Sequence, residues 1–118
     1  MDKATATKTL NNPNALVFGI DLGDRVSHAC ALDRQSGEVV ERFKFKTTRE
    51  GVSGAFAERE ASLVALEVGG HSRWLAISLA AMGHEAVVAH PRALRIISTS
   101  RRKNDVGDAE KLARLARS

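Results

Sequence analysis

The chain has 118 residues, of which 43% are hydrophobic, 27% charged and 4% aromatic, and its formal net charge is +4. This length supports one compact domain, and the composition excludes wholesale disorder and collagen-like repetition. No apolar run approaches the ~18 residues that span a bilayer, and the N-terminus shows no apolar signal-peptide core. With a single cysteine, Cys30, we expect a reduced cytoplasmic domain without a disulfide.

The excess of positive charge lies at the C-terminal end of the chain. Residues 1–91 carry 10 Lys and Arg against 11 Asp and Glu, whereas residues 92–118 carry 8 against 3. Such a local excess favours a polyanionic partner, because neutralised phosphates release counterions. A solvated helix face would give the same pattern, so charge alone leaves both interpretations open.

The first half of the chain predicts a tail followed by three strands. Residues 1–14 are polar and aperiodic, which is typical of a flexible tail. Apolar or alternating segments predict consecutive strands at 15–22, 26–33 and 38–46. In the third strand Phe43 and Phe45 alternate with basic side chains, which is typical of the edge of a sheet.

Helices and strands alternate in the second half. Two further apolar segments predict strands at 63–68 and 85–89. Capping and turn signals predict three helices, with Thr47 and Ser72 as caps of the first two and Pro91 in the first turn of the third. A final helix has helical spacing of small and apolar residues: Ala109, Leu112, Ala113 and Ala116.

This element order predicts a mixed α/β sheet. Three consecutive strands with short turns form an antiparallel meander, whereas strands separated by helices pair in parallel through right-handed crossovers. The result is a five-stranded sheet with flanking helices, which is the ribonuclease H-like arrangement.

Two carboxylates end predicted buried strands. Asp21 lies within GIDLG and Glu67 within ALEVGG. If these strands are parallel neighbours, both side chains leave the sheet at its C-terminal edge, with backbones ~5 Å apart. Ligands of open α/β sheets bind outside that edge. Either acid alone could equally cap a neighbouring turn or helix.

A second acidic pair, Asp105 and Asp108, stands at the predicted start of the last helix. Their spacing puts them on one face, about one turn apart. Acids there also cap a helix and complement its dipole, but a glycine inside the first turn, Gly107, favours close approach of a ligand. Four carboxylates on one side of the sheet would suit hard cations such as Mg²⁺, which Mn²⁺ can replace. Three adjacent cations would hold a nucleic-acid backbone beside them: Arg101, Arg102 and Lys103.

The segments GIDLG (19–23), ALEVGG (65–70) and KNDVGDA (103–109), in this order, resemble the DEDD transposases of the insertion-sequence one-ten type. The resemblance covers about residues 15–117. It implies a RuvC-like, ribonuclease H-fold catalytic domain that cuts and rejoins DNA to move an insertion element. Four acids are implied as its catalytic Mg²⁺ ligands: Asp21, Glu67, Asp105 and Asp108.

The resemblance carries further expectations. Some members are similar to recombinases guided by a non-coding RNA, and we expect the full-length protein to be a homo-oligomer. The family's second domain supplies a serine; we expect that domain to be absent from this chain, which then comprises a catalytic domain over 15–118 that is not competent alone.

Some residues depart from the family pattern and keep other functions open. Gly69-Gly70-His71 replaces Thr-Gly-aromatic, and Asp24 becomes an additional candidate metal neighbour. One alternative is a standalone Holliday-junction resolvase, and another is a non-catalytic nucleic-acid-binding fragment. GIDLG also resembles the first phosphate loop of the sugar-kinase and actin class, but those proteins need two large lobes.

Overall fold

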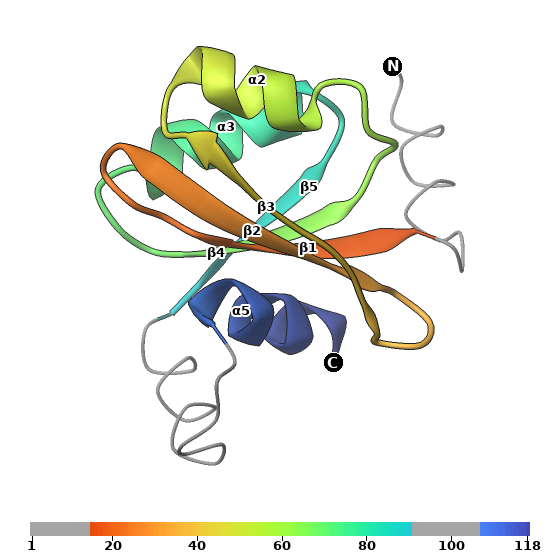
Figure 1. The fold of residues 1–118 in the computed structure, drawn as a ribbon. Coiled ribbons are helices and arrows are strands. Elements are labelled where there is room, and N and C mark those ends of the chain that lie inside the picture. Colours follow the sequence, from red (N-terminus) through yellow and green to blue (C-terminus); the bar gives the residue numbers. More distant parts are fainter. Residues whose placement is uncertain (1–14, 91–106) are drawn as a thin grey trace.

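The computed structural model describes residues 15–90 and 107–118 (Figure 1). The strands of this part are β1 (Leu16–Asp21), β2 (Val26–Asp33), β3 (Val39–Lys46), β4 (Leu63–Glu67) and β5 (Glu85–Ala89). Its helices are α2 (Arg49–Phe56), α3 (Ser72–Ala81) and α5 (Asp108–Arg117). The predicted tail at 1–14 and the predicted helix at Pro91 lie outside the described residues. None of the described helices is long and apolar enough to cross a membrane.

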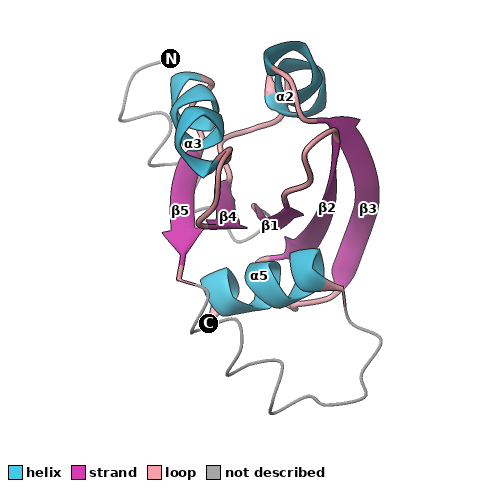
Figure 2. Ribbon diagram, turned by 90° about the vertical axis from the view of Figure 1, so that its left-hand side faces the viewer, coloured by secondary structure: helices cyan, strands magenta, loops and turns pink. Residues whose placement is uncertain are grey.

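The strands form one mixed sheet in the order β3-β2-β1-β4-β5. β1 pairs antiparallel with β2, which pairs antiparallel with β3, whereas β4 lies parallel to both β1 and β5. α2 and α3 cover one face of the sheet and α5 covers the other (Figure 2). The predicted meander, the parallel second half and the edge position of β3 are therefore confirmed.

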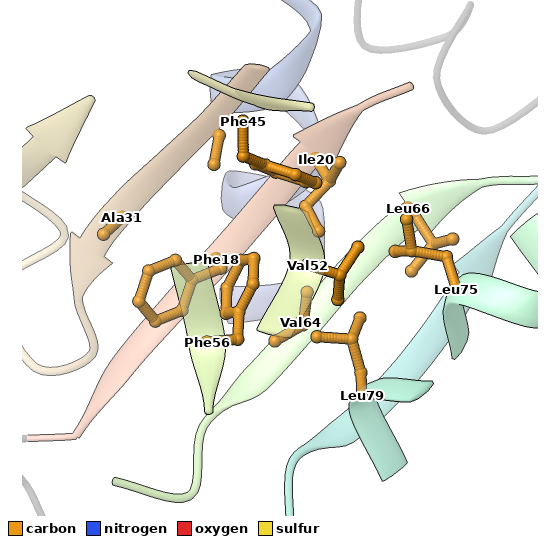
Figure 3. Close-up of a cluster of buried hydrophobic side chains, with 11 residues drawn as sticks. Phe18, Ile20, Ala31, Phe45, Val52, Phe56, Val64, Leu66, Leu75 and Leu79 are labelled. Carbon is orange, nitrogen blue, oxygen red and sulfur yellow. The ribbon is translucent and has the colours of Figure 1, made fainter. Parts of the chain in front are cut away.

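The larger core lies between the sheet and the α2–α3 layer (Figure 3). Side chains alternate along β1, so Phe18 and Ile20 point into this core while Gly19 faces α5. Phe56 of α2 is fully buried against the ring of Phe18, with ring centroids 5.3 Å apart. Leu75 of α3 is buried in the same cluster, together with Leu66, Leu79, Val52 and Val64.

At Gly19 the backbone of helix α5 packs directly on β1. A Cβ atom added at Gly19 would lie 1.9 Å from the carbonyl oxygen of Ala109 and 2.5 Å from the nitrogen of Ala113. Ala109, Leu112 and Ala113 are buried, as their helical spacing predicts. The glycine thus sets how closely the N-terminal half of α5 approaches the end of β1.

Two predicted helix caps are wrong by one residue. Helix α2 is capped by Thr48, whose Oγ1 accepts a hydrogen bond from the Gly51 N–H (2.9 Å). The hydroxyl of Thr47 is instead buried and hydrogen-bonded to the Ser27 hydroxyl (2.7 Å), joining β2 to the end of β3. Likewise the cap of α3 is His71, and Ser72 is its first helical residue.

His84 makes the stability of this fold dependent on pH. Its ring is buried; Nδ1 accepts from the Ser62 N–H (3.1 Å), and Nε2 lies 2.8 Å from the carbonyl oxygen of Phe56. The neutral ring with its proton on Nε2 satisfies both partners, whereas a second proton would face the Ser62 N–H. Burial accordingly lowers the pKa of His84 below its ordinary 6.5.

We expect acid to destabilise the wild-type chain through His84. Because the unfolded chain takes up this proton first, the contribution is complete above pH 6.5 and is lost as the pH falls toward the folded-state pKa. The slope is at most about 1.4 kcal/mol per pH unit. Urea unfolding of wild type and His84→Gln between pH 5 and 8 measures it, since glutamine does not titrate. Equal pH slopes in the two proteins would contradict this account.

Candidate active site

Asp21 and Glu67 end neighbouring parallel strands, as predicted. Ile20 of β1 is paired with Leu66 of β4, so both carboxylates continue this register at the C-terminal edge of the sheet. Both residues are partly buried, and both line a hollow of about 290 Å³. Two of the four predicted acids therefore lie side by side at the C-terminal edge of the sheet.

Asp108 approaches Asp21 from the helix that packs on the same face. It is the first residue of α5 and is exposed, while Asp21 alternates with Gly19 and so lies on the α5 side of β1. Burial, together with the negative charge of Asp108, raises the pKa of Asp21, and His28 partly offsets this. All three line a second hollow, of about 510 Å³. Asp21 thus belongs to both hollows.

The remaining predicted site residues are Asp105, Arg101, Arg102 and Lys103, which lie outside the described residues. Within 15–90 and 107–118, no three His, Cys, Asp or Glu side chains are grouped closely enough to hold a metal ion. The four-acid metal site therefore stays a prediction. Gly107 is the N-cap of α5 and not, as predicted, part of its first turn, and because an N-cap accepts glycine readily, its presence there does not indicate a ligand.

An ion-pair network that the sequence analysis missed orients α5. Glu110, 5% exposed, pairs with Arg42 of β3 and with Arg114 one turn along (2.8 Å). Burial by itself raises the pKa of Glu110, but hydrogen bonds from Arg114 and Arg42 outweigh it, so the pKa lies below its ordinary value. The i,i+4 spacing of Glu110 and Arg114 was readable in the sequence; the pairing with Arg42 was not.

The basic side chains in the described part of the C-terminal segment, which lie on α5, form contacts within the protein. Arg117 donates to the carbonyl oxygens of Arg34 (2.9 Å) and Gln35 (2.7 Å) in the β2–β3 turn. Lys111 lies 3.9 Å from Asp108. Arg114 also donates to the carbonyl oxygen of Gly37 (3.3 Å), so Arg114 and Arg117 attach α5 to the β2–β3 turn.

Other polar side chains surround the acids. Asp24, a further candidate metal neighbour, lies 3.4 Å from His71, and both line the smaller hollow together with Asp21 and Glu67. His28 stands opposite Asp21 in the β1–β2 register, and Lys44 stands opposite His28 in the β2–β3 register. No local sequence signal marks His28 or Lys44 as a site residue, because only strand register places them beside an acid.

The chain matches a family model. The model of the DEDD transposases of the IS110 (insertion-sequence one-ten) type, described as a transposase, matches residues 18–118. No curated protein matches significantly. A solved inorganic polyphosphate/ATP-glucomannokinase from Arthrobacter sp. strain KM is 21% identical, with a TM-score of 0.48, over 80% of this chain. That match spans about half of the kinase chain (51%).

Proposed function

We propose that this chain, which belongs to the IS110-type DEDD transposase family, is the N-terminal catalytic domain of such a transposase, and that it binds metal ions and cuts and rejoins DNA. The strand order, with an antiparallel meander followed by parallel strands, supports a RuvC-like, ribonuclease H-like fold for this domain. The observation that carries the proposal is that Asp21, at the end of β1, lines one hollow with Glu67 and a second hollow with Asp108.

The donor set fits a hard divalent cation. Carboxylate oxygens are the ligands that Mg²⁺ and Mn²⁺ prefer. Burial and, to a smaller extent, the negative charge of Asp108 raise the pKa of Asp21, and a cation held by both carboxylates would relieve their repulsion. In this proposal Asp21, Glu67, Asp105 and Asp108 would hold Mg²⁺, which would activate an attacking oxygen and stabilise a leaving oxygen in phosphoryl transfer.

The protein's own residues do the positioning in this proposal. β1 and β4 hold Asp21 and Glu67 at a fixed separation, because their backbones are paired within one sheet. The Glu110 network and the close contact at Gly19 set the position of Asp108 relative to Asp21. A DNA phosphate would lie outside this edge of the sheet, where the two hollows meet at Asp21.

Calorimetric titration of Mn²⁺ into the 118-residue chain, with and without a short DNA duplex, tests the proposal. We expect saturable binding that Asp21→Asn, Glu67→Gln and Asp108→Asn each weaken about 10- to 100-fold, since one charged ligand contributes about 1.5–3 kcal/mol. Glu60→Gln is the matched control, because Glu60 is exposed and precedes β4 at the opposite edge of the sheet. Equal affinity in all variants, or no saturable binding in either condition, would contradict the proposal.

A further inference from the structure

We infer that two lysines of the edge strand, Lys44 and Lys46, bind the phosphate backbone of a DNA strand and lead it to Asp21 and Asp108. This inference rests on the proposed function and adds to it the path of the DNA. We call these two residues the β3 lysine pair.

Strand register directs the β3 lysine pair toward the acids. Asp21 is paired with His28 on β2, and His28 is paired with Lys44 on β3, so the three form one row across the sheet. Alternation along β3 puts Lys44 and Lys46 on the same face as Arg42, which contacts Glu110 of α5. Both lysines are exposed, as is His28.

Lys44 lies where two hollows meet. It lines the hollow of about 510 Å³ that contains Asp21 and Asp108. It also lines a groove of about 580 Å³ between β3 and α2, to which Lys46 contributes as well. DNA that crosses the β3 edge from this groove to the α5 side of the sheet would therefore pass both lysines before it reaches the acids. Because the lysines are two residues apart, about 6–7 Å along β3, they would contact different phosphates.

The charges of the β3 lysine pair are not neutralised by described neighbours. Arg42 and Arg59, its basic neighbours along these hollows, pair with Glu110 and Glu41. No carboxylate of residues 15–90 or 107–118 lies within ion-pair distance of Lys44 or Lys46.

Edge-strand lysines also prevent strands of separate molecules from pairing. That role needs only an exposed charge, however, and gives no reason for Lys44 to share a hollow with the two acids. The positive charge of this surface therefore favours a polyanion. Because the surface adjoins Asp21 and Asp108 in a domain of the transposase family, we assign this polyanion as DNA.

Fluorescence anisotropy of a labelled DNA strand with the 118-residue chain, measured over a range of salt concentrations, tests the inference. Removing two phosphate contacts in Lys44→Gln/Lys46→Gln should reduce the slope of log K against log salt by about 1.4–1.8. The double variant Lys44→Arg/Lys46→Arg keeps the charges and should keep the slope. Arg34→Gln is a control, because it removes one positive charge just beyond the C-terminal end of β2, far from the β3 lysine pair. This variant should also keep the wild-type slope.

The outcomes separate this inference from the proposed function. A wild-type slope in the glutamine double variant, with DNA still bound, overturns the β3 path and leaves the Mn²⁺ result untouched. Absence of DNA binding by the wild-type chain overturns both. A matched RNA strand is measured in parallel, and a slope change confined to RNA overturns the assignment to DNA. Circular dichroism checks the fold, which exposed side chains should not affect.

Discussion

Replacing Gly19 with alanine is expected to destabilise the chain by about 1–3 kcal/mol or more and to move α5 away from β1. The added Cβ would lie 1.9 Å from the Ala109 carbonyl oxygen and 2.5 Å from the Ala113 nitrogen. Both are backbone atoms, so no side-chain rotation can relieve the overlap and the helix itself must shift. Urea unfolding measures the loss of stability.

The same substitution should also change the candidate site. Since Asp108 is the first residue of α5, a displaced helix weakens its repulsion of Asp21, and the pKa of Asp21, followed by carboxyl-carbon NMR, should fall. Gly54→Ala is the matched control: a Cβ at Gly54 meets nothing within 4 Å, and alanine in α2 should stabilise by roughly 0.5–1 kcal/mol. Equal stability of Gly19→Ala and wild type would show that α5 does not pack on β1 as described.

Phe56→Ala is expected to have the largest effect on stability, about 3–5 kcal/mol. The ring is fully buried and has T-shaped contacts with Phe18 and Phe45, at centroid distances of 5.3 and 5.7 Å, and with His84 at 5.9 Å. Its removal leaves a cavity between the sheet and α2 that these rings cannot fill by small shifts.

Thermal or urea unfolding measures the effect of Phe56→Ala, with Ile77→Ala as its control. Ile77 of α3 is 60% exposed, so its truncation should change the free energy of unfolding by no more than about 0.5 kcal/mol. Because Phe56 lies on the face opposite α5, Mn²⁺ affinity should be unchanged wherever the variant remains folded. A loss below 1 kcal/mol would contradict the described core.

Elements whose signals are local are predictable from the amino-acid sequence alone. β2 and β5 have the predicted bounds, Val26–Asp33 and Glu85–Ala89, because apolar periodicity depends on neighbours along the chain. The adjacency of Asp21 and Glu67 was also predictable, since parallel strands bring their carboxyl ends to one edge.

The features that depend on residues distant in the sequence, namely the choice of helix cap and the side chains beside Asp21, are set by the tertiary structure. Thr47 and Thr48 each carry a hydroxyl group that could cap α2. Because the Thr47 hydroxyl is hydrogen-bonded to the buried Ser27, Thr48 is the residue that caps the helix. His28 and Lys44 lie in line with Asp21 because two antiparallel registers place them there. Sequence periodicity reports which face a side chain occupies, but a register is set by pairing energy summed over whole strands, so the row beside the acids emerges only when the sheet assembles.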